Sequence, residues 1–172
     1  DGSILAADVL VFTGESLLVY NELFGDFSLP SKQLRGVILT PPTATTHHDQ
    51  LLNQIQHKAL QNDLVILDNG DVLEGLLTGI PKNGGRANDT TAPTLWITLK
   101  SPRQSTKVPF EKVAAFLFNS SLVTTPRPLE QAVVIGFSDG SKLTASSLEL
   151  HDNNVTVSLL ANARLSADAK AF

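Results

Sequence analysis

A turn of the same type occurs three times in this chain, each time between apolar segments. The turns centre on Gly2, Gly70 and Gly140, which are 68 and 70 residues apart. Asn-Gly and Asp-Gly between apolar runs favour a type I′ hairpin, because both central residues of that turn need a positive φ. Recurrence at a nearly constant spacing predicts three copies of one supersecondary unit.

The residues that follow each turn glycine also match between the copies. Copies one and three align without a gap, so that Leu34 of copy one falls on Phe172 of copy three. Copy two carries extra residues, roughly Pro81–Pro93, and then rejoins the pattern, so that Pro30 falls on Pro109. We expect this insertion to be an exposed and mobile hairpin tip.

Each copy has the signature of short strands joined by tight turns. Apolar and polar residues alternate roughly with period two, as in a strand with one buried face. Copy two carries every strand signal of the unit, over Leu64–Asp68, Val72–Ile80, Leu95–Lys100, Lys107–Val108 and Ala114–Phe118. Five short strands, the last two joined by a helical turn, are typical of a small SH3-like barrel. The sequence therefore predicts a mainly β chain of tandem small SH3-like (Sm-like) barrels.

One segment has helical periodicity instead. Between residues 46 and 61 the apolar residues are Leu51, Leu52, Ile55, Ala59 and Leu60. Spacings of three and four residues place such side chains on one face of a helix. Thr46 is a candidate N-cap, with Asp49 three residues later as a box-like partner. We expect one amphipathic helix at about 46–61, packed against copy two.

The three copies divide the chain into three predicted parts. Residues 1–41 form repeat one, which lacks the first strand, and residues 42–120 hold the helix and the complete barrel of repeat two. Residues 121–172 form a linker and repeat three, which lacks the last strand. Incomplete copies leave sheet edges with unpaired backbone groups, and such edges seek partners. We therefore expect residues 1–40 and 130–172 to associate, either within one chain or as a strand-exchanged homodimer.

The composition disfavours several classes of function. The 172 residues include no cysteine, which removes disulfides, thiolate metal sites and cysteine nucleophiles together. The net charge of −4 disfavours nucleic acid as a partner, because phosphate-binding surfaces normally carry a basic excess. No apolar run reaches the length of a membrane span.

The candidate catalytic and metal-binding residues fit structural roles better. Asp68, Asp71 and Glu74 surround the second turn, where Asp and Asn are ordinary turn residues, and their spacing is not that of a calcium loop. His48 and His57, with His47 beside the first, lack the three- or four-residue spacing that puts metal ligands on one helical face. The sequence also lacks a G-x-S-x-G elbow and a phosphate loop. It therefore predicts no enzyme, no metal and no cofactor.

Aromatic residues bear on carbohydrate binding, because sugar platforms need exposed Trp or Tyr. The chain has one of each, Trp96 and Tyr20, and both lie in predicted strands. Trp96 alternates with Leu95 and Ile97, so the spacing allows either face. We interpret Trp96 as a core residue and keep it as the one candidate ligand-binding residue.

Residues 46–118 resemble the Sm-like fold. The order is a helix, then "DLVILDNGDVLEGLLTGI", then a strand pair and a one-turn link, and Asn69-Gly70-Asp71 is similar to the first Sm-like signature segment. The resemblance implies RNA sites at an Asp/Asn-containing loop and at an Arg-Gly pair. Copy two reads "PKNGGRANDTTAP" and "PFEKVAA" in those regions, and Arg35-Gly36 of copy one lies near the expected place once only.

A second resemblance covers the whole chain. The repeated sequence pattern that starts with DG-x-L, together with an LL-x-x-I helix between copies one and two, is similar to a region of large bacterial extracytoplasmic proteins. That region precedes carbohydrate-binding modules of the NPCBM type and implies an extracytoplasmic or secreted location. We therefore expect a non-enzymatic scaffold or interaction module, whose partner is a protein or a neighbouring domain of the same precursor. The alternatives are a carbohydrate-binding unit and, less favoured, an Sm-like RNA-binding protein.

Overall fold

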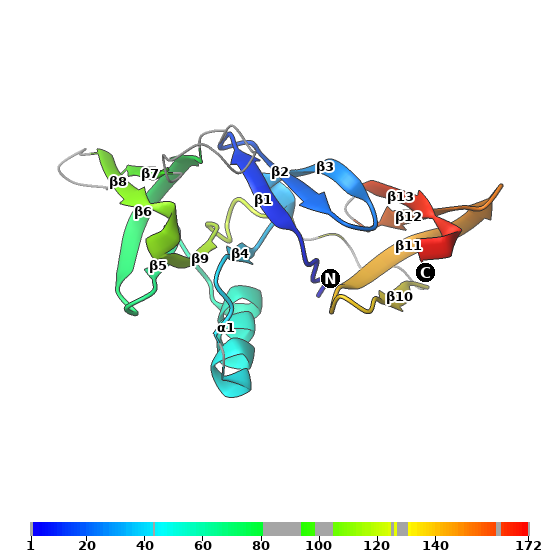
Figure 1. Cartoon of the computed structure of the whole chain (residues 1–172). Helices are drawn as coiled ribbons and strands as arrows, with labels where there is room; N and C mark the ends of the chain where they lie inside the picture. Colours follow the sequence, from blue (N-terminus) through cyan, green and yellow to red (C-terminus); the bar gives the residue numbers. More distant parts are fainter. Residues whose placement is uncertain are drawn as a thin grey trace. The chain divides into compact units, whose positions relative to one another are not determined.

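The structure is a computed structural model, and its ribbon is drawn in Figure 1. It describes residues 2–42, 44–80, 94–98, 105–124, 126, 131–160 and 163–171, with backbone alone for 94–98, 105 and 171. The predicted hairpin tip at 81–93 lies outside these ranges, so its exposure and mobility stay predictions.

The described residues form three antiparallel sheets and one α-helix, which confirms a mainly β chain. The first sheet has the order β1 (Asp8–Phe12), β2 (Ser16–Asn21), β3 (Gly25–Pro30). The second has the order β10 (Val133–Gly136), β11 (Lys142–His151), β12 (Asn154–Leu159), β13 (Arg164–Asp168). The third has the order β4 (Gly36–Ile38), β9 (Val113–Leu117), β5 (Asp63–Leu67), β6 (Val72–Gly79), β7 (Thr94–Thr98), β8 (Ser105–Pro109). No pairing among these described strands joins the two ends of a sheet.

The three copies share their turns as well as their strands. Gly2, Gly70 and Gly140 have φ of 78°, 87° and 88°, so a glycine in the left-handed region is common to the aligned turns. The predicted type I′ turn is wrong at the second and third turns, because Asn69 and Asp139 do not have the positive φ that the first central residue of that turn needs. A 3₁₀ turn lies at equivalent positions in every copy, directly after β3, β8 and β13: η1 (Ser31–Gln33), η2 (Phe110–Lys112) and η3 (Ala169–Ala171). The predicted repeat and the predicted helical turn between the last two strands of copy two are therefore confirmed.

Two compact units cut across the copies. Unit 1 comprises Asp1–Asp8, Leu18–Leu29 and Thr124–Phe172, and unit 2 comprises Val9–Leu17 and Pro30–Val123. Copy one thus supplies residues to both units, and each unit is described here by itself.

Unit 1 joins the start of copy one to copy three. The N–H and the carbonyl oxygen of Ile4 bond the carbonyl oxygen and the N–H of Lys142, at 2.6 and 2.7 Å. The Ser3 hydroxyl accepts a bond from the backbone N–H of Thr144 at 3.0 Å. Leu5, Phe24 and Phe27 of copy one pack against a buried cluster from copy three, which consists of Leu143, Ala145, Val155, Val157 and Leu165. The beginning of copy one thus associates with copy three within one chain, as predicted, whereas its last strand, β4, pairs with β9 of copy two and not with copy three.

Unit 2 joins other parts of copy one to copy two. Phe12 and Ile80 exchange backbone hydrogen bonds of 3.1 and 2.8 Å, and both side chains are almost fully buried. The Phe12 ring lies 6.4 Å from the Phe116 ring and 5.4 Å from the Phe118 ring, measured between centroids. The last strand of copy one, β4, pairs with β9 of copy two, with Val37 opposite Phe116.

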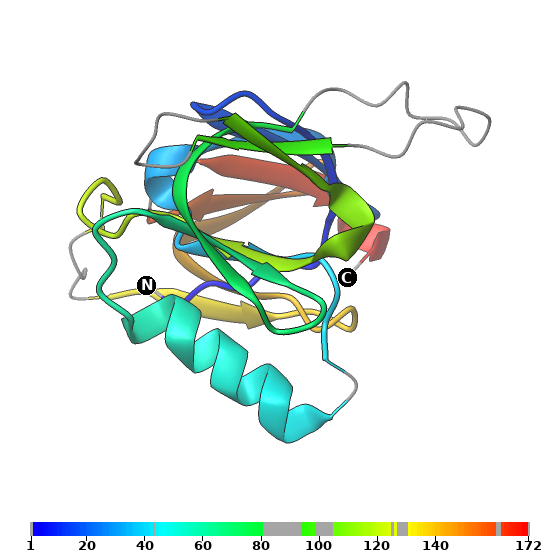
Figure 2. The same ribbon diagram turned by 90° about the vertical axis from the view of Figure 1, so that its left-hand side faces the viewer.

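The helix packs on unit 2 but has other ends than the sequence predicts. Helix α1 (Thr45–His57, cyan in Figure 2) buries Ile55 against Leu64 and Leu117. The predicted Thr46 cap is wrong, because Ala44 is the N-cap and its carbonyl oxygen accepts the first helical bonds.

The predicted helix end at 61 is also wrong. Leu60 donates its backbone N–H to the Ser120 hydroxyl at 2.8 Å and accepts that hydroxyl's bond at 3.1 Å. These bonds draw the backbone at Leu60 away from the helical ladder, so a tertiary contact overrides the apolar spacing that predicted a longer helix.

Candidate functional site

The carboxylates around the second turn act as turn residues. The Asn69 side-chain amide donates to the Asp71 carboxylate at 2.7 Å, and the Asp71 backbone N–H donates to Asn69 Oδ1 at 3.0 Å. The Glu74 carboxylate accepts a hydrogen bond from the Asn62 side chain, and the Asp68 backbone N–H bonds the carbonyl oxygen of Lys112. The predicted turn chemistry is confirmed at Asn69 and Asp71, and the carboxylates of Asp71 and Glu74 accept hydrogen bonds from different residues.

The histidines of α1 also have separate partners. His48 Nδ1 lies 3.9 Å from the Asp49 carboxylate, and His57 Nδ1 lies 3.2 Å from the Asn53 carbonyl oxygen. Over the described residues, no three His, Cys, Asp or Glu side chains group as metal ligands would. The described part of the chain therefore offers no metal centre to build on.

Trp96 and the Arg35-Gly36 pair were the remaining sequence candidates. Trp96 lies in β7, where its backbone pairs with Gly79 and Lys107, and its side chain lies outside the described part. Its role as a ligand-binding residue stays a prediction. Gly36 has a packing role instead, because an added Cβ would come within 2.7 Å of the Phe116 carbonyl oxygen.

A buried carboxylate that the sequence analysis missed holds unit 2 together. Asp63 is 8% exposed; its Oδ2 accepts the Leu77 backbone N–H at 2.9 Å, and its Oδ1 accepts the Asn119 N–H at 2.7 Å. Both oxygens thus bond backbone groups that are distant in sequence, and Asn119 in turn donates its side-chain amide to the Gln61 carbonyl oxygen at 2.7 Å. A carboxylate occupied in this way is a structural tie rather than a catalytic base. The sequence feature that could have identified Asp63 is its position as an acidic residue at the start of an apolar strand.

A second polar tie lies in unit 1. The buried Asn21 side chain donates to the Ala6 carbonyl oxygen at 2.7 Å and to Asp139 Oδ2 at 3.3 Å. Partial burial works to raise the pKa of Asp139, but hydrogen bonds from Ser141 and Asn21 outweigh it, so that pKa lies below its ordinary value. Asp139 therefore stays ionised as an acceptor that joins copy one to the third turn.

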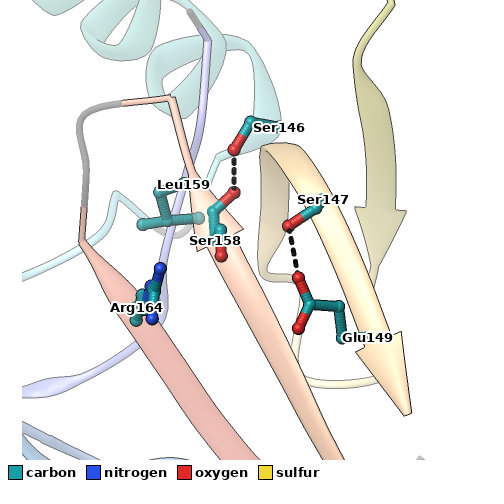
Figure 3. A pocket seen from close by; sticks show the side chains of 6 residues that line it. All are labelled: Ser146, Ser147, Glu149, Ser158, Leu159 and Arg164. Atoms are coloured by element: carbon teal, nitrogen blue, oxygen red, sulfur yellow. Dashed lines mark hydrogen bonds between the residues drawn. The ribbon is translucent and has the colours of Figure 1, made fainter.

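Figure 3 shows a hollow on copy three that is open and polar. It has a volume of about 290 Å³ and lies over strands β11, β12 and β13 of unit 1; it is lined by Ser146, Ser147, Glu149, Ser158, Leu159 and Arg164. The Ser146 hydroxyl donates to the Ser158 carbonyl oxygen at 3.0 Å, and the Ser147 hydroxyl lies 3.4 Å from Glu149 Oε1. Small-molecule sites are usually enclosed and mostly apolar, so this hollow lacks the character of one.

Copy three exposes apolar side chains whose equivalents are buried in the other copies. Leu150 is 70% exposed, whereas its equivalents Phe12 and Ile80 are almost fully buried. Val134 on β10 is 60% exposed, whereas its equivalent Leu64 on β5 is 7% exposed. Exposed apolar residues beside a sheet edge mark surfaces that other chains can cover. The described part of copy three thus contains the strongest candidate binding surface.

The described residues include no helix with the length and apolar character needed to cross a membrane. Comparisons with protein-family models, with curated proteins and with solved structures found no match to this chain.

Proposed function

We propose that this chain is a non-enzymatic interaction module, in which small β units join one another by pairing equivalent strands. Two pairings in unit 2 support this. Phe12 pairs with Ile80 and Val37 pairs with Phe116, and in each pair the two residues occupy the same position in copies one and two. Antiparallel pairing of equivalent positions is an isologous contact, the kind that relates subunits of a symmetric dimer.

The same rule operates in unit 1. Ile4 and Lys142, which bridge copies one and three, both lie two residues after their turn glycines. The segment that follows the turn glycine thus pairs with its equivalent in another copy twice, once between copies one and three and once between copies one and two. A scaffold built from such units needs backbone pairing and apolar contact, and it needs no catalytic group.

The observation that carries the proposal is the exposed Leu150. The equivalent residues of copies one and two cover each other, whereas Leu150 is left at the end of β11 with most of its surface in water. Exposing a large apolar side chain forgoes roughly 1.5–3 kcal/mol relative to burying it fully. A free surface of the type that the other copies already use for contact is what an interaction module requires.

We further infer that each copy is a small SH3-like (Sm-like) barrel. The order β9-β5-β6-β7-β8, with η2 between β8 and β9, supports this inference for copy two. Backbone NOEs between β8 and β9 are expected if the barrel closes, and their absence in an assigned spectrum would refute closure.

Binding arrays test the proposed function against its rivals. The intact chain is labelled and applied to extended apolar peptides, to glycans and to oligo-U RNA. We expect saturable binding to peptides with alternating or continuous apolar residues, and weaker binding to the Leu150→Asp variant. Binding to glycans without binding to any peptide would show instead that the chain is a carbohydrate-binding unit. Salt-dependent binding to the RNA would replace it with nucleic-acid recognition.

A further inference from the structure

The second and third turns have the same backbone hydrogen bonds but differ in the residue before the glycine. In the second turn the Gly70 N–H donates to the Leu67 carbonyl oxygen at 3.0 Å, and in the third the Gly140 N–H donates to the Phe137 carbonyl oxygen at 3.1 Å. The second turn has Asn69 before its glycine, whereas the third has an aspartate. The second turn therefore places a side-chain amide next to a glycine nitrogen.

An asparagine followed by a glycine can modify itself, because glycine has no side chain to hinder the approach of its backbone nitrogen. At Asn69 a bond forms between the Gly70 nitrogen and the side-chain carbon Cγ. The bond from Cγ to Nδ2 breaks, and Nδ2 leaves as ammonia with the proton of the Gly70 N–H. Water then opens the resulting succinimide ring at one of its two carbonyl carbons. The products are an aspartate or an isoaspartate at position 69.

The third turn lacks the leaving group for this reaction. Asp139 Oδ1 accepts the Ser141 backbone N–H at 2.8 Å, and Asp139 Oδ2 accepts the Asn21 side-chain amide at 3.3 Å. Both oxygens accept from N–H donors, as those of a carboxylate do, and a carboxylate has no ammonia to release. The comparison identifies the side-chain amide of Asn69 as the reactive difference between two turns of the same form.

The surroundings of Asn69 expose it to water and also restrain it. Asn69, Gly70 and Asp71 are all exposed. The Asn69 side-chain amide donates to Asp71 Oδ2 at 2.7 Å, and Asn69 Oδ1 accepts the Asp71 backbone N–H at 3.0 Å. Attack on Cγ requires the Asn69 side chain to leave these bonds and the Gly70 N–H to leave the Leu67 carbonyl oxygen. The Asp71 carboxylate also disfavours loss of a proton from the nearby Gly70 nitrogen, because it is an anion.

We propose that Asn69 is a self-modification site, which loses its side-chain amide to the backbone nitrogen of Gly70, and that Asp71 restrains this reaction in the folded chain. The inference goes beyond the proposed function and does not depend on it. The isoaspartate product adds one carbon atom to the main chain inside the turn. Because the turn sets the pairing of Ile66 with Val72, we expect the modified chain to lose hydrogen bonds at this end of the β5–β6 hairpin.

The test follows the reaction in the intact chain, incubated in mildly alkaline buffer. Trypsin releases the peptide 59–82, and mass spectrometry with an isoaspartyl methyltransferase assay locates the product within it. The other Asn-Gly pair of the sequence, at 83–84, falls in a different tryptic peptide. We expect the product at position 69 before any at Asn62 of the same peptide. The Asn69→Ser variant, which keeps a side-chain oxygen for the Asp71 N–H, should give no product there.

Substitutions at the neighbouring acids test the restraint. Asp71→Ala removes the acceptor of the Asn69 amide, so we expect the reaction to be about fivefold faster, the factor that one ordinary hydrogen bond supplies. Asp68→Ala is the matched control, because Asp68 is an exposed acid of the same turn and the change in charge is the same. Its rate should equal that of wild type. Circular dichroism checks that each variant folds, and wild type in concentrated urea gives the rate without the folded turn.

The two parts of the proposal fail separately. Equal rates in wild type and a folded Asp71→Ala variant would overturn the role of Asp71. A reaction that Asp68→Ala accelerates as much as Asp71→Ala would also overturn it, because the effect would then belong to the net charge of the turn. Absence of product at position 69 in every folded variant, after the chain in urea has reacted completely, would overturn the site itself.

Discussion

Replacing Asp63 with alanine should destabilise unit 2 more than any other single change at a carboxylate of β5 or its turn. The substitution removes the acceptor of the Leu77 N–H and of the Asn119 N–H, which bond Asp63 at 2.9 and 2.7 Å. A buried donor without a partner costs about 1–3 kcal/mol. The desolvation cost of the carboxylate itself disappears, which offsets part of the loss. We expect a decrease of about 2–4 kcal/mol in the free energy of unfolding.

Urea denaturation followed by tryptophan fluorescence measures this change. Trp96 is the single tryptophan and lies in β7, so its emission reports the unfolding of unit 2. A lower midpoint with an unchanged slope would show that stability alone has changed. Asp63→Asn keeps one acceptor oxygen but sets its amide against the other donor, so we expect an intermediate loss.

Asp68→Ala is the matched control for this prediction. Asp68 is an exposed acid just after the same strand, and the substitution makes the same change in charge. Surface substitutions of this type usually fall within about 0.5 kcal/mol of wild type. If Asp63→Ala lost no more stability than Asp68→Ala, Asp63 would not be the tie that its hydrogen bonds indicate.

Three further predictions concern single positions. Gly36→Ala should destabilise unit 2 by about 1–3 kcal/mol, because its Cβ would meet the Phe116 carbonyl oxygen at 2.7 Å; a thermal melt unchanged from wild type would contradict this. Leu73→Pro should unfold unit 2, because Leu73 lies inside β6 opposite Val65 and proline removes a ladder bond; a cooperative wild-type transition would refute that assignment. The folded pKa of Asp139 lies below the unfolded value of about 3.9, so its contribution to stability is present above that pH and is lost as the pH falls through the folded pKa. Asp139→Asn should therefore weaken the acid dependence of unit 1, measured by NMR of unit 1 amides; an unchanged acid profile would argue against it.

The features set by local chemistry were predictable from the sequence. Gly70 and its equivalents needed a positive φ, and the turn that follows Pro109 needed one helical turn, so both could be read from residue type and spacing. Which strands pair between copies was harder. Val37 and Phe116 share a position in the repeat, but the repeat alone does not say whether equivalent strands meet or stay apart.

The residues of the candidate sites were likewise only partly predictable from the sequence. Val134 lies on β10, the first strand of copy three, and its 60% exposure could not be read from its apolar side chain. Asp63 escaped notice because its role depends on Asn119, a residue 56 positions away that no local pattern links to it. The end of α1 was wrong for a similar reason, since Ser120 holds Leu60 from a distance.

The sharing of copy one between two units has a consequence for the order of folding. The bond from Thr144 to Ser3 spans 141 positions and the bond from Ala6 to Ser141 spans 135, whereas Phe12 meets Ile80 after far fewer residues. Contacts distant in sequence form late, because the loop must close before they can contribute. During synthesis, the first residues of copy one must therefore wait for the third turn to leave the ribosome. Unit 2 can assemble around Phe12 in the meantime, and the chain should acquire its structure from the middle outward.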